Sequence, residues 1–313
     1  MNFQQLRYIR ETVRQGLNLT EAAAKLFTSQ PGVSKQIREL EHELGVEIFV
    51  RRGKRIVSLT LPGEQVLKVA ERVLDEADNL KRVASEFRDI EAGTFAIATT
   101  HTQARYALPR VVSEFRKKYP KVHLSLHQGT PQQVAGMVID GVADVGVATE
   151  ALAGYPALLA LPAYTWSHCV LVPPKHPLLR DAAITLEALS RYPIVTYDAA
   201  FTGRTHIDEA FVAKGLKPDI VLAASDSDVI KAYVELGLGV GIVAAMAFDE
   251  DRDRELRRID AAHLFPTNTS RIAVKRGIFL RGFAYDFLEL FSPRLSRKSV
   301  ERALKGGQEM YEL

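Results

Sequence analysis

Cysteine is almost absent from this chain, and so are long apolar runs. Cys169 is the only cysteine among the 313 residues, which excludes an internal disulfide and a cysteine-cluster metal site. No apolar stretch is long enough to span a bilayer, and the polar N-terminus leads straight into an amphipathic pattern rather than a signal peptide. The sequence therefore predicts a cytoplasmic protein without a membrane partner.

Catalytic and metal-binding patterns are also lacking. The histidines from His101 onward never stand at metal-ligand spacing with carboxylates, and no G-x-S-x-G elbow of a serine hydrolase occurs. The glycine-rich run at 237–241 precedes an apolar strand rather than a helix, so it is a poor phosphate loop. We therefore expect neither an enzyme nor a metal or cofactor site.

Charge is distributed unevenly along the chain. With 47% hydrophobic and 25% charged residues, the composition is that of a globular protein, and the length suits two or three domains. Residues 1–61 carry ten Lys and Arg against six Asp and Glu, a net of +4, whereas the remainder carries thirty-one against thirty-two, a net of −1. A basic N-terminal module on a near-neutral body indicates a polyanionic partner at that end.

The stretch 20–44 organises the basic module, because it has the pattern of two short helices joined by a polar turn. In its second half, Val33, Ile37, Leu40 and Leu44 recur at spacings of four, three and four and so predict one apolar stripe. At about 100° per residue, polar and basic residues fall on the opposite face. That outer face carries Pro31, Lys35, Arg38 and His42, with Ser34 on its flank. The pattern is typical of a DNA-reading helix-turn-helix; a helical hairpin with a solvated basic face is the alternative.

The segments before the polar turn complete a three-helix unit. A first helix over 2–16 should pack behind the other two, and Thr20 should cap the second. The predicted buried side chains are Phe3, Leu6, Ile9 and Val13 in the first helix and Ala23, Leu26 and Phe27 in the second.

A basic hairpin is predicted next. Val46, Ile48 and Val50 recur at every second position, as do Val57 and Leu59, which predicts two strands. The turn between them is Arg51-Arg52-Gly53-Lys54-Arg55, and four cations in five residues suit phosphates or a narrow minor groove. We interpret the hairpin as the wing of a winged helix; a solvated turn is the alternative.

A long helix is predicted from residue 62 to about residue 88, after a cap at Thr60. Its heptad positions favour a dimerising coiled coil, although packing on its own domain is the alternative. The heptad stripe is Val66, Val69, Val73, Leu80, Val83 and Phe87, and an adjoining stripe is Leu67, Ala70, Leu74, Ala77 and Ala84.

From Thr94 onward, strands alternate with helices, which predicts parallel sheets with crossover helices. The number of elements suits two small α/β lobes. Strands are expected at 94–100, 122–128, 143–148, 169–173, 193–197, 219–224, 240–245 and 271–275, and helices at 103–118, 131–140, 203–214, 226–236 and 281–291.

Hydroxyl-rich segments stand where such sheets bind ligands, beyond the carboxyl ends of strands. Residues 99–103 follow the first strand, Thr149 follows the third, and residues 201–204 take the equivalent place in the second lobe. Backbone N–H groups and positive helix ends at these places suit a small anion held without a salt bridge. The alternative is that each threonine only caps its own helix.

The N-terminal module resembles LysR-type transcriptional regulators. The residues that carry the resemblance are Ser29-Gln30-Pro31, Ser34, Ile37, Leu40-Glu41, Leu44-Gly45, Phe49, Arg51, and Thr60 with Gly63. The resemblance implies a multidomain α/β protein with an N-terminal winged helix-turn-helix, a long linker helix and a two-lobed effector domain like that of periplasmic binding proteins. The implied boundaries are 1–61 for the DNA-binding domain, 62–90 for the linker coiled-coil helix, 93–163 plus 267–291 for lobe I, 164–266 for lobe II, and 292–313 for a tail that we expect to be a solvated helix.

The second half resembles one branch of this family, the cysteine-regulon activators of the CysB/Cbl type. The motifs are TTHTQARYALP (99–109), ATEAL (148–152), the segment 164–166, YPIVTYDAAFTGR (192–204) and SDSDVIKAYVELGLGVGIV (225–243). The resemblance implies N-acetylserine or O-acetylserine as the effector, with sulfate as a further ligand of the cleft. The implied ligand residues are Thr100, Thr102, Gln103, Thr149 and Thr202. Trp166 is a candidate cleft wall, with a lobe-packing aromatic as the alternative.

These features together predict a ligand-responsive activator of sulfur assimilation and cysteine biosynthesis genes. The expected DNA-binding residues are Ser29, Gln30, Pro31, Ser34, Lys35, Arg38, Arg51, Arg52, Lys54 and Arg55. We expect Gln30, Pro31 and Ser34 to approach the base edges and the cations to bind phosphates. The resemblance further implies a homotetramer, a dimer of dimers that binds promoter DNA and recruits RNA polymerase. A LysR-type regulator of another small-anion pathway and a cytoplasmic solute-binding α/β protein are the alternatives.

Overall fold

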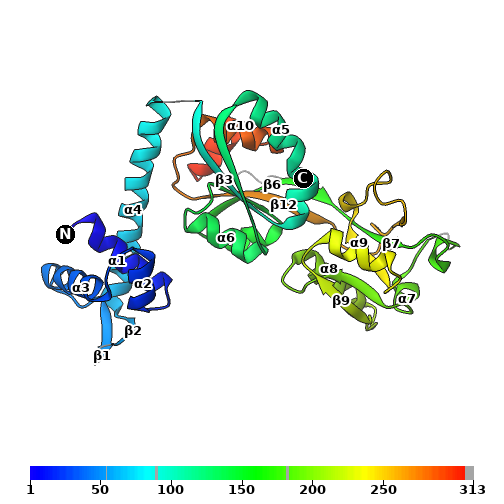
Figure 1. Cartoon of the computed structure of the whole chain (residues 1–313), viewed down its shortest axis with the longest axis horizontal. Helices are drawn as coiled ribbons and strands as arrows, with labels where there is room; N and C mark the ends of the chain where they lie inside the picture. Colours follow the sequence, from blue (N-terminus) through cyan, green and yellow to red (C-terminus); the bar gives the residue numbers. More distant parts are fainter. Residues whose placement is uncertain (54, 89–90, 181–182, 307–313) are drawn as a thin grey trace. The chain divides into compact units, whose positions relative to one another are not determined.

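The computed structural model describes residues 1–53, 55–88, 91–180 and 183–306. The chain forms two compact units, residues 1–87 and 88–313, and each has its own core (Figure 1). In the described part of the chain, no helix is both long enough and apolar enough to cross a membrane. Lys54 of the predicted wing lies outside the described residues, as does the end of the predicted tail.

The N-terminal unit contains the three short helices, the hairpin and the long helix that the sequence predicts. Its elements are α1 (Phe3–Arg14), α2 (Leu19–Lys25), α3 (Gln30–Leu44), β1 (Phe49–Arg52), β2 (Arg55–Leu59) and α4 (Leu61–Arg88). One apolar core joins them through side chains such as Ile9, Ala23, Ile37, Phe49 and Leu74. This shared core fixes the turn between α2 and α3 against the hairpin, because each element buries its apolar face in it.

Several predicted details of this unit are wrong. Asn18, not Thr20, caps α2, because its side chain accepts two N–H groups of the first turn and Thr20 lies inside that turn. Phe27 is 98% exposed rather than buried: its φ of 52° turns the chain between α2 and α3 and directs the ring outward. Phe3 and Leu44, at the ends of their helices, are exposed as well.

The predicted hairpin is present, with β1 antiparallel to β2. Phe49 is buried and Val50 is exposed, so the predicted alternation of Ile48 with Val50 is wrong, and a register irregularity follows between Val50 and Arg51. Helix α4 begins against this hairpin: Thr60 Oγ1 accepts the N–H of Gly63 at 2.9 Å. A Cβ on Gly63 would stand 2.0 Å from the carbonyl oxygen of Ile48. Only glycine permits this approach, which explains the T-x-x-G pattern.

The two apolar stripes of α4 have different surroundings. Ala70 and Leu74 of the adjoining stripe are buried in the core of the N-terminal unit, so for this stripe the alternative of packing on its own domain is correct. The heptad stripe is largely open, with Leu80 71% and Phe87 83% exposed. A coiled coil with a second copy through this stripe stays a prediction.

Lobe I of the second unit is a five-stranded sheet with helices on both faces. Its elements are β3 (Ala92–Thr99), a π-helical turn η1 (Gln103–Ala107), α5 (Leu108–Lys118), β4 (Lys121–Gln128), α6 (Pro131–Ile139), β5 (Val145–Ala148), η2 (Glu150–Gly154), β6 (Leu158–Trp166), β12 (Asn268–Lys275), α10 (Gly282–Phe291) and α11 (Arg297–Leu304). The strand order is β4-β3-β5-β12-β6. Helices α5 and α10 cover one face and α6 the other (Figure 1).

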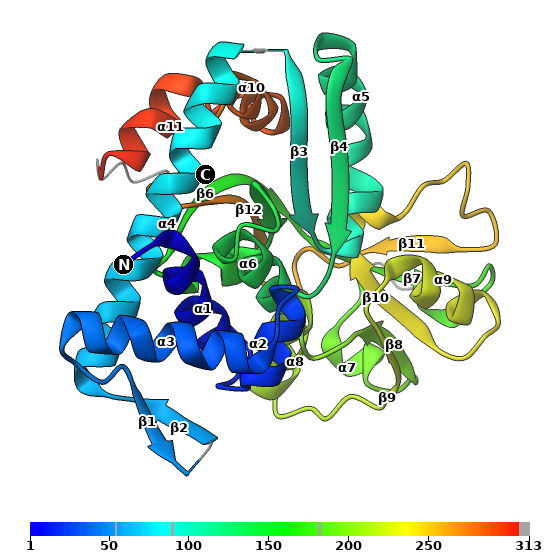
Figure 2. The same ribbon diagram turned by 60° about the vertical axis from the view of Figure 1, so that its left-hand side comes forward.

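Lobe II is a second five-stranded sheet with the order β11-β7-β10-β8-β9. Its elements are β7 (His168–Val172), η3 (Pro177–Arg180), α7 (Leu186–Leu189), β8 (Ile194–Tyr197), α8 (Thr202–Ala213), β9 (Ile220–Ala224), α9 (Ser227–Glu235), β10 (Val240–Ala244), η4 (Ala245–Ala247) and β11 (Arg257–Asp260). Helices α7 and α8 pack on one face and α9 on the other (Figure 2).

Both sheets are mixed, whereas the alternation of elements predicted parallel sheets. β3 is parallel to β4 and β5, but β12 is antiparallel to β5 and β6, and β7 is antiparallel to β10 and β11. The antiparallel strands are those that carry the chain between the lobes. β6 ends at Trp166, β7 begins at His168, and β12 returns at Asn268, opposite Trp166. The crossing lies beyond Trp166, whereas the family resemblance placed it between 163 and 164.

The structure differs from the prediction in three further elements. Strands β6 and β11 were not predicted from the sequence, and helix α11 was expected to be solvated. β6 contains Pro162, which lacks a donor for the ladder and sits where the register with β12 shifts, and β11 is a short, charged strand. In the tail, α11 buries Val300 and Ala303 in the lobe I core. Its described part is therefore a packed helix rather than a solvated one.

Candidate functional site

The outer face of α3 brings together the predicted DNA-reading residues. Ser29 caps the helix by accepting the N–H of Gly32 at 3.3 Å, which leaves Gln30 and Pro31 in the first turn. One open hollow along this face is lined by Gln30, Pro31, Ser34, Lys35, Arg38, Glu39 and His42. The predicted base-edge and phosphate contacts of α3 therefore share one accessible surface.

The cations of the wing differ in their surroundings. Arg52 and Arg55 are exposed, and within the described ranges no carboxylate pairs with either of them. Arg51 is partly buried, and its Nη1 lies 2.8 Å from Glu41 Oε2. This ion pair gives Arg51 a part in holding the fold, while its contact with DNA stays a prediction.

Glu41 connects the recognition helix to the wing. Its side chain is buried, and Oε1 accepts the backbone N–H groups of Ile48 at 2.9 Å and Phe49 at 3.1 Å. Its second oxygen pairs with Arg51. The carboxylate therefore satisfies two buried donors and one guanidinium, so it sets the direction in which β1 leaves α3. The sequence showed Glu41 only as part of a family motif.

A second site lies between the lobes of the effector unit. After β3, the chain passes through Thr100 and Thr102 into the η1 turn that precedes α5. A cavity there is lined by Thr100, Thr102, Gln103, Pro131, Thr149, Trp166, Tyr197, Phe201, Thr202 and Gly203. All six residues predicted to bind the ligand therefore line one cavity, and they come from both lobes.

The two lobes touch each other across this cavity. Thr149 Oγ1 of lobe I lies 2.6 Å from Thr202 Oγ1 of lobe II, and Thr102 Oγ1 lies 3.5 Å from Ser227 Oγ. The free volume left between these side chains is about 30 Å³, far below the about 300–1,000 Å³ of ligand pockets in proteins. The cleft is closed to a ligand of ordinary size, so binding such a ligand requires the lobes to separate.

Four residues that the sequence analysis did not single out support the lining. Gln103 Nε2 donates to Ser270 Oγ at 2.9 Å, and its Oε1 accepts the hydroxyl of Tyr164. The hydroxyl of Tyr197 lies 2.8 Å from Ser227 Oγ and accepts a backbone N–H of β10 at 2.9 Å. These bonds hold the side chains of both lobes in fixed rotamers around the cavity.

Position at a strand end could have identified two of these residues, because Ser227 follows the end of β9 by three residues, as Thr102 follows β3. Tyr197 ends β8, at the edge where α/β sheets bind ligands. Ser270 lies inside β12, and the local sequence there does not distinguish it from a packing residue. Its role follows from a contact with a residue 167 positions away.

The cavity lining offers hydrogen bonds without a full charge. It consists of hydroxyls, one amide, aromatic rings, proline and glycine. Trp166 Nε1 is a buried polar atom without a hydrogen-bond partner among the described residues, and so is Nε2 of His168 behind it. No side chain caps the first turn of α8, at Thr202. Neutral donors and a free helix N-terminus can hold a small anion or zwitterion.

His168 lies behind the lining, fully buried against the rings of Trp166 and Phe265. Burial lowers the pKa of His168 to about 3; nearby His206 acts in the same direction, and the backbone of Gly203 opposes it. The imidazole is therefore neutral near pH 7, which keeps this side of the cleft uncharged.

Acid should destabilise the effector unit through His168. The folded pKa, about 3, lies below the value of about 6.5 in the unfolded chain. The unfolded state therefore binds the proton first: the contribution of His168 is fully present above about pH 6.5 and is lost toward pH 3, by about 1.4 kcal/mol per pH unit. Urea unfolding followed by Trp166 fluorescence, at about pH 7 and about pH 5, measures it. His168→Gln should flatten the pH dependence; an unchanged slope would assign the effect to other groups.

The chain combines an exposed basic helix-turn-helix face and a wing with a two-lobed domain that has a polar cleft. This combination defines a DNA-binding regulator that also carries a ligand-binding domain. Comparison with protein families supports this class. Residues 3–64 match the bacterial regulatory helix-turn-helix protein, lysR family, and residues 88–296 match the LysR substrate binding domain. The chain belongs to the LysR family, and it is a transcriptional regulator rather than an enzyme.

Individual relatives narrow the assignment. The chain is 56% identical over 313 residues to the HTH-type transcriptional regulator CysB of Burkholderia cenocepacia, with 100% of both chains covered. It is 54% identical over 305 residues to the regulator SsuR of that species, covering 97% of this chain and 99% of SsuR. The solved cofactor-binding domain of the Cbl transcriptional regulator matches with a TM-score of 0.66 and 47% identity, covering 68% of this chain and 93% of that chain. The predicted resemblance to the CysB/Cbl branch is confirmed.

Proposed function

We propose that this protein activates genes of sulfur assimilation and cysteine biosynthesis in response to N-acetylserine or O-acetylserine, with sulfate as a further ligand. The observation that carries the proposal is the cleft of neutral donors between two lobes, on a chain related over its whole length to CysB. Acetylserine presents a carboxylate and carbonyl oxygens, which are acceptors for the hydroxyls, the Gln103 amide and the first turn of α8.

The effector would act by changing the separation of the lobes. In the closed state the free volume between them is about 30 Å³, a small fraction of the about 300–1,000 Å³ that ligand pockets provide. Binding therefore selects an arrangement in which Thr149 and Thr202 are further apart. A ligand shifts such an equilibrium only by its difference in affinity for the two arrangements.

Assembly would carry this change to DNA. The open stripe of α4, which includes Val69, Val73, Leu80 and Phe87, suits a coiled coil with a second copy. Two recognition helices can then address half-sites about one DNA turn apart or a multiple of it. We propose a homotetramer, a dimer of dimers, that recruits RNA polymerase in the cytoplasm, where its promoter DNA is found.

Replacing Thr102 or Thr202 with alanine should weaken binding of acetylserine about tenfold, because each change removes a hydroxyl that lines the closed cleft. Titration calorimetry with N-acetylserine, O-acetylserine and sulfate measures this directly, and a DNase footprint should lose its response in parallel. Thr205→Ala is the matched control, since Thr205 lies on α8 but is exposed and outside the lining. A wild-type protein that binds none of the three ligands would favour a regulator of another small-anion pathway.

A further inference from the structure

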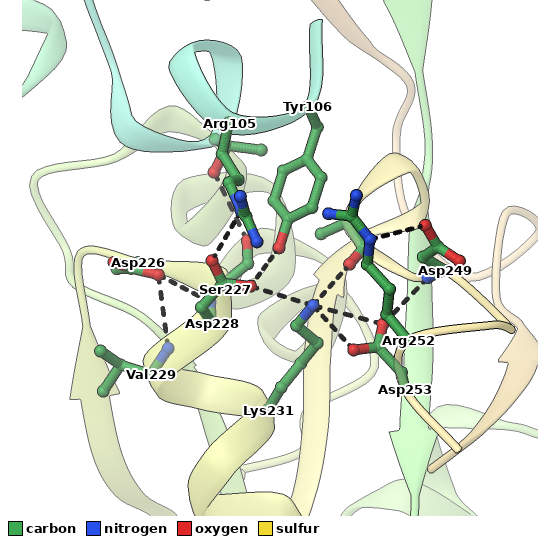
Figure 3. Close-up of polar contacts among 12 residues, drawn as sticks. Arg105, Tyr106, Asp226, Ser227, Asp228, Val229, Lys231, Asp249, Arg252 and Asp253 are labelled. Carbon is green, nitrogen blue, oxygen red and sulfur yellow. Dashed lines mark hydrogen bonds and ion pairs between the residues drawn. The ribbon is translucent and has the colours of Figure 1, made fainter. Parts of the chain in front are cut away.

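Tyr106 extends from lobe I into lobe II, outside the ligand cavity. Its ring packs against the core cluster of lobe II that contains Ile230 and Val234. The ammonium of Lys231 lies 5.3 Å from the ring centroid, and the hydroxyl donates to the carboxylate of Asp228 (Figure 3). One side chain of lobe I thus makes an apolar, a cation–π and a hydrogen-bond contact with the other lobe.

One ion pair and one histidine–carboxylate contact beside Tyr106 also join the lobes. Arg105 Nε lies 3.2 Å from Asp228 Oδ2, and His101 Nε2 lies 2.9 Å from Asp226 Oδ2. Figure 3 shows Arg105 and Tyr106 directed together at Asp228. Asp228 is therefore the point on lobe II that receives both side chains.

Asp228 is held firmly within lobe II. Lys231 Nζ lies 3.0 Å from Asp228 Oδ1, 3.0 Å from Asp253 Oδ1 and 3.0 Å from the carbonyl oxygen of Ala247. Lys231 and Asp253 are buried. Because Lys231 ties Asp228 to the segment after β10, Asp228 cannot follow lobe I when the lobes separate (Figure 3).

The same two segments are also connected to the cavity lining. In the η1 turn, Gln103 lines the cavity while Arg105 and Tyr106 reach Asp228. At the start of α9, Ser227 contacts Thr102 across the cleft. In the chain it lies between Asp226 and Asp228, which receive His101 and Arg105. A ligand that separates Thr102 from Ser227 must therefore lengthen the contacts of Tyr106 and Arg105.

We propose that Tyr106 and Arg105, docked on Asp228, form a latch that holds the lobes closed without effector and thereby sets the effector affinity. These are positioning residues, because they lie outside the cavity lining and act through the separation of the lobes. The latch extends the function proposed above and rests on it only for the identity of the effector. Since only an opened cleft has room for the ligand, the closed fraction lowers the apparent affinity.

Lobe opening can be measured without any effector. Trp166 is the only tryptophan of the chain and lines the cleft, so quenching of its fluorescence by acrylamide reports access to the cleft in the full-length protein. Tyr106→Ala, Tyr106→Phe and Arg105→Gln should each raise the quenching constant, by about twofold for Tyr106→Ala. Arg110→Gln is the matched control: it removes an exposed charge from α5, and among the described residues Arg110 has no ion pair with lobe II.

The same variants should bind N-acetylserine about three- to tenfold more tightly, because less of the protein is held closed. A mutation that merely damages the fold would not tighten binding, and Tyr106→Phe keeps the ring in place if Tyr106→Ala is unstable. Unchanged quenching in all three variants, or weaker binding of N-acetylserine, would overturn the latch. A third outcome separates the two proposals. If the variants show increased quenching but even the wild type binds neither N-acetylserine nor sulfate, the latch is supported and the proposed effector is wrong.

Discussion

Replacing Glu41 with alanine is expected to lower the unfolding free energy of the N-terminal unit by about 3–5 kcal/mol. The change leaves the buried N–H groups of Ile48 and Phe49 without an acceptor and removes the partner of the half-buried Arg51 guanidinium. Each orphaned buried donor costs about 1–3 kcal/mol. DNA binding should be lost together with the fold of the wing, although Glu41 does not face the predicted DNA surface.

Urea unfolding monitored by two probes separates this effect from damage elsewhere. Far-UV circular dichroism should show an earlier transition for Glu41→Ala, whereas the fluorescence of Trp166, which belongs to the other unit, should keep its midpoint. Glu39→Ala is the control on the same helix. Glu39 is exposed and its contact with Lys35 spans 3.8 Å, so a change below about 1 kcal/mol is expected. Equal losses in the two variants would contradict the structural role of Glu41.

Replacing both Arg52 and Arg55 with alanine should weaken binding to promoter DNA about a hundredfold at low salt. Both side chains are exposed on the wing, and no carboxylate in the described part of the chain competes for them. Each phosphate contact releases about 0.9 of a counterion, so the slope of log K against log salt should fall by about 2. Fluorescence anisotropy over a series of salt concentrations measures both quantities.

Two control variants test whether the effect depends on where the charge lies and whether it concerns the choice of DNA sequence. Arg110→Ala removes a charge from the effector unit and should leave the salt slope unchanged. Gln30→Ala, in the first turn of α3, should change which sites are preferred more than it changes the salt slope, since base edges rather than phosphates carry sequence information. A salt slope that is unaffected by loss of Arg52 and Arg55 would show that the wing does not contact the backbone of DNA.

Local patterns predicted most of the elements of this protein. The spacing of Val33, Ile37 and Leu40 placed α3 correctly, because a helix repeats its buried face every three or four residues and all three side chains are fully buried. Strand β5 was recognisable as a short apolar run bounded by Asp144 and Thr149. The identity of the family also followed from local motifs, since both family models match where the motifs lie.

Errors arose where a distant contact outweighs the local pattern. Glu41 looked like an ordinary residue of the recognition helix, but it pairs with Arg51 ten positions later and accepts two N–H groups at the start of the wing; the contact of Arg51 with DNA stays a prediction. Phe27 looked like a core residue, but a left-handed turn exposes it. The antiparallel strands that connect the lobes could not be read from alternation, because it does not show that the chain leaves lobe I at Trp166 and returns at Asn268.

By itself, the sequence determined the class of this protein: a basic helix-turn-helix, a wing, a long helix and a two-lobed domain with threonines at strand ends. The tertiary structure decided the state of the cleft and what holds it closed. Thr149 meets Thr202 across 53 positions, and Tyr106 meets Asp228 across 122. Helix and strand periods record only near neighbours, so pairings of this length become visible only when packing brings the two lobes together.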